Sequence, residues 1–169
     1  DGTDLTDYRF SMSSRGHAEP TFPASGVILI DGHLWVDRGE EPLRLRLLRD
    51  LTIIVDGNFY LGRSLRVDGD GRLTVVARGG RGVREGVGSV WLGLPCKEVT
   101  ADVVDLEASI LADADLRVEA GLVIVRGGIV SLGGLSRGLG GRELRVTGER
   151  VFDIHRERMP GFEPCGSPR

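Results

Sequence analysis

Short apolar runs separated by glycine and aspartate dominate the sequence from Gly26 onward. They read GVILIDG, HLWVDRG, LTIIVDG, NFYLG, LRVDGDG and LTVVARGG. Each apolar run is four to six residues long, which is too short for a stable helix and typical of a β-strand. The alternation of leucine and arginine from Leu43 to Leu48 also predicts a strand, with a short helix beginning at Glu41 and Pro42 as the alternative. The chain is therefore predicted to be all-β.

Similar segments recur along the chain. LRVDGDGRLTVV begins at Leu65, LRVEAGLVIV at Leu116 and LRVTGERVFDI at Leu144. The strand-like runs that begin at Leu51 and Leu73 lie 22 residues apart. A unit of this size cannot bury its own apolar face, whereas stacked units share one continuous core. We therefore predict a single-domain β-solenoid, similar to a parallel β-helix, over residues 25–155, and a β-sandwich or jelly roll is the alternative.

Composition supports one turn-rich domain. The 169 residues include 26 glycines and 7 prolines, with 40% hydrophobic and 28% charged residues. This composition argues against a helical bundle and against disorder over most of the chain. Residues 1–24 are predicted to be an arm or irregular cap, and residues 156–169 an irregular tail. The sequence contains no apolar run of 18 residues and begins at Asp1, so we expect any membrane anchor or signal to lie outside it.

Charge is unevenly distributed although the net charge is only −3. Residues 63–84 are mainly basic and residues 98–119 mainly acidic. Four arginines lie on or beside the glycine-rich segment from Gly79 to Gly88: Arg72, Arg78, Arg81 and Arg84. Several guanidinium groups on a loop can bind phosphates or carboxylates, so we predict that this loop contacts an acidic partner. The alternative is that basic and acidic segments are ordinary solvated faces paired across adjacent coils.

Two motifs resemble functional sites but lack the rest of the pattern. Residues 134–138 read GLSRG, as in a hydrolase nucleophile elbow, yet the next residues cannot start the helix that an elbow needs. Ser136 is therefore expected in a surface turn without a catalytic role. Asp68 and Asp70 alternate with glycine as in a calcium loop, but Gly79 stands where the last ligand should be, so a plain turn is expected. Trp35, Phe59, Tyr60 and Trp91 lie within strand-like runs and are expected to pack in the core or at coil edges.

The cysteines and histidines do not form a metal-binding pattern. Cys96 and Cys165 are the only cysteines, and none of the three histidines is spaced to complete a zinc site with them. We expect no metal and no cofactor. We predict that Cys96 and Cys165 form a disulfide that ties the tail to the body of the domain, and two unrelated free thiols are the alternative.

The order of these segments resembles the PilX-like proteins associated with type IV pili and type II secretion pseudopili. The resemblance covers residues 26–164 and is carried by GVILIDG, LTIIVDGNFYLG, the LGL of residues 92–94, the alanine-rich stretch of residues 106–112, LVIVRGGIVS and an Arg-, Asp- and Pro-containing tail. It implies a non-enzymatic minor pilin or pilus-tip ectodomain in the cell envelope or outside the cell.

The resemblance also implies partners and supplies no catalytic residues. Other pilins or pilus-assembly proteins would be the partners, and a membrane helix outside this sequence would be the anchor. The rigid surface would serve assembly, adhesion or DNA uptake, and the arginine loop would contact a neighbouring pilin or, weakly and with strong salt dependence, extracellular DNA. The alternatives are a carbohydrate-active β-helix enzyme and a bactofilin-like cytoskeletal protein that polymerises.

Overall fold

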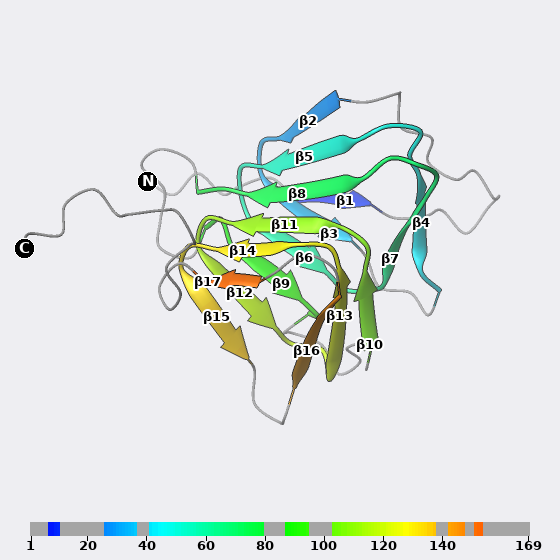
Figure 1. Ribbon diagram of the computed structural model, residues 1–169. Coiled ribbons are helices and arrows are strands. Elements are labelled where there is room, and N and C mark those ends of the chain that lie inside the picture. Colours follow the sequence, from blue (N-terminus) through cyan, green and yellow to red (C-terminus); the bar gives the residue numbers. More distant parts are fainter. Residues whose placement is uncertain are drawn as a thin grey trace, which may run out of the picture.

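The structure, a computed structural model, describes residues 7–10, 26–36, 41–79, 87–94, 103–137, 142–147 and 151–153. Every regular element in these ranges is a β-strand, and the strands form three parallel sheets (Figure 1). None of the described elements is a helix with the length and apolarity to span a membrane. The all-β prediction is confirmed.

Each sheet is a ladder of strands from successive coils. Sheet A has the order β1 (Asp7–Phe10), β3 (His33–Val36), β6 (Phe59–Leu61), β9 (Val90–Leu92), β12 (Asp115–Val118) and β15 (Gly134–Arg137). Sheet B has the order β4 (Leu43–Arg46), β7 (Leu65–Asp68), β10 (Val103–Leu106), β13 (Leu122–Arg126) and β16 (Glu143–Thr147). Sheet C has the order β2 (Gly26–Ile30), β5 (Leu51–Val55), β8 (Leu73–Ala77), β11 (Ser109–Ala112), β14 (Ile129–Ser131) and β17 (Val151–Asp153).

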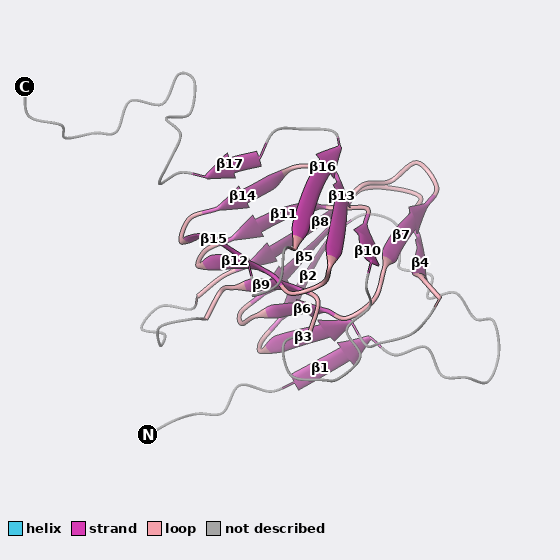
Figure 2. Ribbon diagram, turned by 90° about the horizontal axis from the view of Figure 1, so that it is seen from below, coloured by secondary structure: helices cyan, strands magenta, loops and turns pink. Residues whose placement is uncertain are grey.

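The chain visits the three sheets in turn, and from β2 onward each set of three strands completes one coil. Strands of the same sheet pair in parallel with the coil before and the coil after, as Figure 2 shows from below. This arrangement is a β-solenoid and confirms that prediction. A sandwich or jelly roll would require antiparallel pairs, and every described pair is parallel.

The core forms because alternate residues of each strand point inward. In β5, Leu51, Ile53 and Val55 are buried, while Thr52 and Ile54 are only half-buried on the outer face. Register places equivalent inward residues directly above one another, so that each coil buries the apolar face of its neighbours. A fully buried aliphatic side chain contributes about 1.5–3 kcal/mol, and the stack therefore stabilises coils that would not fold singly.

The predicted coil length of 22 residues is confirmed in the first coils, where Leu51 pairs with Leu73 and Leu43 with Leu65. The later coil in which Ile110 pairs with Ile129 is 19 residues long. The three LRV segments are nevertheless not equivalent repeats, and that interpretation was wrong. Leu65 and Leu144 lie in sheet B at different register positions, and Leu116 lies in sheet A. Any solenoid strand with two inward apolar residues and one outward arginine can read LRV. The segment therefore indicates an alternating strand and does not identify its sheet or register.

The structure also decides two local predictions, one for residues 43–46 and one for the N-terminal arm. Leu43–Arg46 is a strand, as expected, and not the alternative helix. Strand β1 lies in the predicted N-terminal arm and adds a strand to sheet A beside β3, which the sequence analysis did not predict. The tail at residues 156–169 lies outside the described residues.

Candidate functional site

The corner between sheets B and C changes width partway along the solenoid. Leu65 and Leu106 occupy the same position in sheet B, and Val75 and Ile110 the same position in sheet C. Ten positions separate Leu65 from Val75, but only four separate Leu106 from Ile110. The first two coils therefore carry six extra residues at this corner. We call the resulting projection, residues 44–50 and 66–72, the corner lobe.

The corner lobe is packed and not loosely looped. Leu45 and Leu47 are buried in it, and the amide of Leu47 donates to the carbonyl of Asp68 at 2.8 Å. Gly69 has a φ of +108°, and a Cβ there would collide with the backbone of Leu47. The DGDG sequence thus allows two turns to stack in contact, which side chains would prevent.

A groove of about 600 Å³ lies beside the corner lobe, where the narrower coils begin. The lobe side is formed by Val67, Gly69 and Arg72, together with other residues of the first two coils. The opposite side includes Glu107 and Arg126, which stand where β10 and β13 end. We call this space the corner groove.

Hydroxyl side chains form one side of the corner groove. Thr52, Thr74 and Ser109 occupy equivalent outward positions on β5, β8 and β11, and all three line the space. Neighbouring strands are about 4.8 Å apart, so these hydroxyls form a regular column along the solenoid axis. Such a column can hydrogen-bond an extended ligand that carries polar groups at a similar spacing.

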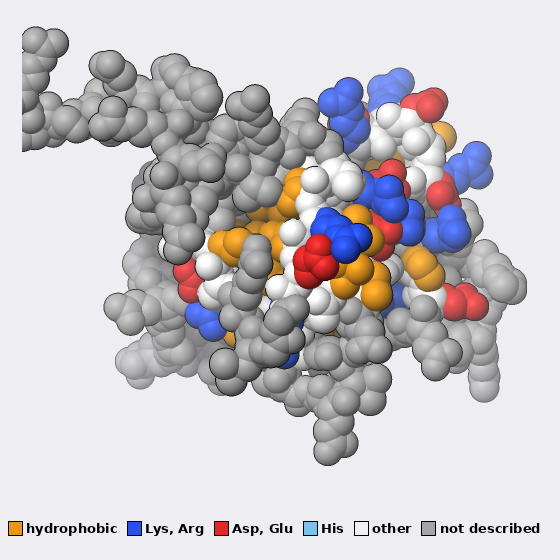
Figure 3. Space-filling view, turned by 60° about the horizontal axis from the view of Figure 1, so that its bottom comes forward, with side chains coloured by type: hydrophobic (Ala, Val, Ile, Leu, Met, Phe, Trp, Pro, Cys, Tyr) orange, Lys and Arg blue, Asp and Glu red, His pale blue; other side chains and the backbone are white. Residues whose placement is uncertain are grey.

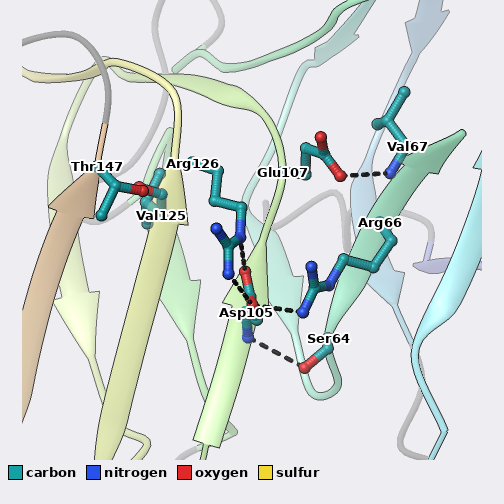
Figure 4. Close-up of polar contacts among 8 residues, drawn as sticks. All are labelled: Ser64, Arg66, Val67, Asp105, Glu107, Val125, Arg126 and Thr147. Atoms are coloured by element: carbon teal, nitrogen blue, oxygen red, sulfur yellow. Dashed lines mark hydrogen bonds and ion pairs between the residues drawn. The ribbon is translucent and has the colours of Figure 1, made fainter. Parts of the chain in front are cut away.

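Next to the groove, side chains replace backbone pairing between β7 and β10. The ladder contains one register pair there, Leu65 with Leu106. The amide of Asp105 donates to Ser64 Oγ at 3.0 Å, and the amide of Val67 donates to Glu107 Oε2 at 3.1 Å (Figure 4). Because β7 diverges from β10 into the corner lobe, one amide of each strand is bound by a side-chain acceptor in place of a backbone carbonyl.

Asp105 is the centre of the polar network at this divergence. Its side chain accepts from Arg66 Nη2 at 2.6 Å and from Arg126 Nε and Nη2, each at 3.1 Å (Figure 4). Hydrogen bonding to Asp105, reinforced by its charge, raises the pKa of Arg126 above its ordinary value. No sequence pattern marks these residues as a group, because only the fold brings β7, β10 and β13 together.

Some of the charges in the basic and acidic segments are paired across coils. Acidic residues of the 98–119 segment pair with arginines of neighbouring coils, namely Asp105 with Arg66 and Arg126, and Glu119 with Arg142. On the face drawn in Figure 3, basic and acidic side chains lie next to one another. These pairs support the alternative interpretation of charges paired across coils.

Aromatic rings form a ladder on the outer face of sheet A. Trp35 stacks on Tyr60 with centroids 3.9 Å apart and planes 12° apart, and Tyr60 lies 5.9 Å from Trp91 at 26°. The guanidinium of Arg117 lies 4.5 Å from the centroid of Trp91. Since the ring faces are turned toward one another, this ladder packs coil against coil. Trp35, Tyr60 and Trp91 are half-buried on the outer face, and not in the core or at a coil edge as expected. Phe59 is buried in the core.

A second ladder, on the outer face of sheet C, is aliphatic. The same register position is occupied in five successive strands by Leu29, Ile54, Val76, Leu111 and Val130. Leu29 is 58% exposed, and the other four are half-buried against their neighbours. We call these five residues the aliphatic ladder. Its sequence signal is the lack of alternation in LTIIV, LTVVA and SILA.

The predicted arginine cluster is divided by the fold. Arg72 precedes β8 and lines the corner groove, whereas Arg78 follows β8 and its Nη2 donates to Asp56 Oδ2 at 2.8 Å. The five-residue strand between them separates the two positions by roughly 20 Å. Arg81 and Arg84 lie outside the described residues, as do Cys96 and Cys165.

The two motif interpretations have different outcomes. Ser136 lies within β15 and is exposed, so the expectation that it lies in a surface turn was wrong. A serine inside a paired strand is not presented as a nucleophile elbow requires. Asp68 to Gly71 forms a turn of the corner lobe, with Asp68 accepting from Arg44 at 3.4 Å. Within the described ranges, no three His, Cys, Asp or Glu side chains gather to hold a metal ion.

Comparison of the chain with protein-family models, with curated protein sequences and with solved structures gave no match in any of the three.

Proposed function

We propose that the chain is a non-enzymatic, pilus-associated module of the cell envelope or extracellular space, which docks other pilins or pilus-assembly proteins on a rigid solenoid surface. The observation that supports this proposal is the aliphatic ladder of sheet C. An outward position of a solenoid strand is in contact with water, yet five successive coils place Leu, Ile or Val there.

The aliphatic ladder has the shape of a helix-docking strip. Four strand spacings of about 4.8 Å give it a length of roughly 19 Å. An amphipathic helix presents an apolar line of the same kind through residues i, i+3, i+4 and i+7. We therefore assign the strip to the apolar face of a helix in a pilin-type partner. Contiguous exposed apolar surface is typical of interaction sites.

Paired substitutions test the docking proposal. Pilin subunits encoded in the same genome are immobilised, and binding of the parent chain is compared with that of Val76→Lys/Leu111→Lys. We expect the double variant to bind at least tenfold more weakly. Leu48→Lys is the matched control, because Leu48 is 64% exposed on the corner lobe and away from the ladder. Equal binding by parent and double variant, or no binding of any pilin by the parent, would refute the proposal.

Carbohydrate binding is a second candidate function, and the hydroxyl column of the corner groove favours it. Calorimetry with hexasaccharides of β-1,4-linked glucose and of galacturonate is the direct measurement. Thr74→Val/Ser109→Ala should bind at least tenfold more weakly than the parent, while Ser136→Ala, on the exposed face of β15, should match it. If neither hexasaccharide binds, or if the double variant binds as tightly as the parent, this candidate is wrong.

Contact with DNA through Arg72, Arg78, Arg81 and Arg84 remains a separate prediction. Because Arg78 is paired with Asp56, we expect Arg72→Ala and Arg81→Ala/Arg84→Ala to weaken binding more than Arg78→Ala. Binding of a short duplex should be weak and should fall steeply between 50 and 200 mM salt, as phosphate contacts do. Retention of duplex binding at high salt, or by a variant that lacks all four arginines, would exclude this role.

A further inference from the structure

We propose that two copies of this chain join head to tail, with β17 of one copy pairing with β2 of the next while β15 pairs with β1. The joint would continue sheets C and A across two molecules. It uses the ends of the solenoid and shares only Leu29 with the aliphatic ladder, whose docking test substitutes Val76 and Leu111 instead.

Strand β2, at one end of the solenoid, has an outer edge that pairs with no other described strand, and it carries exposed apolar side chains. The amide of Gly26 donates to Asp50 and the carbonyl of Ile30 accepts from Asp56, so these alternate residues face β5. In a parallel ladder the intervening residues, Val27 and Leu29, turn their amides and carbonyls to the other side. Their side chains are 66% and 58% exposed. An apolar strand at the edge of a sheet is a template for a further strand.

The two ends of the solenoid are stepped in a complementary way. At the β2 end, sheet A extends one strand further than the first coil, because β1 lies beyond β3. At the other end, sheet C extends one strand further than the last coil, because β17 lies beyond β14. When β17 meets the next copy's β2, the next copy's β1 falls level with β17 and meets β15. Both contacts form at one axial offset, and all strand directions stay parallel.

At this joint the register of sheet C would align the column of the aliphatic ladder in one copy with the same column in the next. In sheet C, Ile28 and Val151 occupy the register column of the core residues, and Leu29 and Phe152 occupy the column of the aliphatic ladder. Phe152 of one copy would therefore lie level with Leu29 of the next. Asp153 would fall at the register position level with Ile30.

Such a joint does not close on itself. Each copy uses one end as donor and the opposite end as acceptor, so the contact is heterologous and repeats along the solenoid axis. Sheet B keeps one vacant level between β16 and the next copy's β4 at each joint. Growth should therefore give thin, unbranched filaments whose length rises with protein concentration.

Two variants, each defective at one end, test this geometry by sedimentation velocity and negative-stain microscopy. Val27→Lys/Leu29→Lys disables the β2 end, and Phe152→Lys disables the β17 end. Each variant alone should remain a monomer at concentrations where the parent forms filaments. An equimolar mixture should form one-to-one dimers and stop, because the two remaining functional ends fit each other.

Further controls make each outcome decisive. Leu48→Lys and Val76→Lys/Leu111→Lys should form filaments like the parent, and Asp153→Val should lower the concentration needed at least severalfold. Far-ultraviolet circular dichroism confirms that each variant keeps its strands. A parent that stays monomeric at every concentration overturns the proposal. So does a closed dimer that Phe152→Lys still forms, because that dimer would be head to head.

Discussion

Arg66 on β7 and Asp105 on β10 form an ion pair at 2.6 Å where backbone pairing between their two strands is reduced to a single register pair. Asp105 also holds Arg126 on β13. One carboxylate therefore connects three coils at the place where the corner lobe diverges and the corner groove begins (Figure 4).

Asp105→Asn should destabilise the chain by about 2 kcal/mol. Asp105 is only 6% exposed, and the substitution removes the charged oxygen that accepts hydrogen bonds from the two arginines. The value lies below that of a fully buried ion pair, since both arginines are partly in water. Asp68→Asn, in the more exposed pair with Arg44, is the control and should cost about 0.5 kcal/mol or less. Urea unfolding measures both changes. Equal losses would show that Asp105 does not hold the divergence together.

The pair between Asp56 and Arg78 should make stability depend on pH in acid. Hydrogen bonding to Arg78 lowers the pKa of Asp56, against an opposing effect of desolvation. The ionised carboxylate is therefore favoured by the fold. Its contribution should be fully present above the ordinary pKa of about 4 and should disappear as the pH falls through the lowered folded-state value.

This dependence is measured as the difference in urea midpoint between the parent and Asp56→Asn at pH 7, 5 and 3. The difference should be positive and constant from pH 7 to 5 and smaller at pH 3. In an Arg78→Gln background, Asp56→Asn should have little effect at any pH. A difference that grows as the pH falls would contradict the assigned pair.

Tyr60→Leu should break the aromatic ladder at its centre. We expect a loss of roughly 1.5–4.5 kcal/mol, since three ring contacts, with His33, Trp35 and Trp91, worth about 0.5–1.5 kcal/mol each disappear. The chain has two tryptophans, Trp35 and Trp91, and both flank Tyr60. The near-ultraviolet circular dichroism of the folded protein should therefore fall sharply. Tyr60→Phe keeps the rings and removes only the acceptor of Asn58 Nδ2, so its spectrum should remain close to that of the parent.

Gly93→Ala should be much more damaging than Gly134→Ala. Both glycines have positive φ, +100° and +126°, so both variants carry backbone strain of about 1–3 kcal/mol. A Cβ at Gly93 would also lie 2.7 Å from the carbonyl carbon of Glu119 in the neighbouring coil, whereas nothing lies within 4 Å at Gly134. Gly93→Ala should therefore lose at least about 2 kcal/mol more in thermal or urea unfolding. Similar losses would show that coil spacing at Gly93 is not limiting.

The strands, their approximate coil length and the solenoid could be predicted from the sequence, because they follow from local alternation and from the need of short strands to stack. LTIIV and LTVVA, 22 residues apart, already contain the buried positions Ile53 and Val75. Alternation does not indicate which sheet a strand joins, so the LRV segments were misassigned. The glycines around Ser136 indicated a turn, although the residue lies in β15. It also does not predict β1, whose pairing with β3 spans residues far apart in sequence.

Which side chains meet depends on how the coils stack, and this could not be predicted from local patterns. Asp105 is 39 residues from Arg66 and 21 from Arg126, and the coil stack alone brings the three together. Arg72 and Arg78 are only six residues apart in sequence, but the extended strand β8 lies between them and holds them at its opposite ends. A solenoid aligns residues one coil apart and spreads residues along one strand. Charge clusters in the sequence therefore become ion pairs between coils, and the outward positions of separate strands become continuous surface ladders.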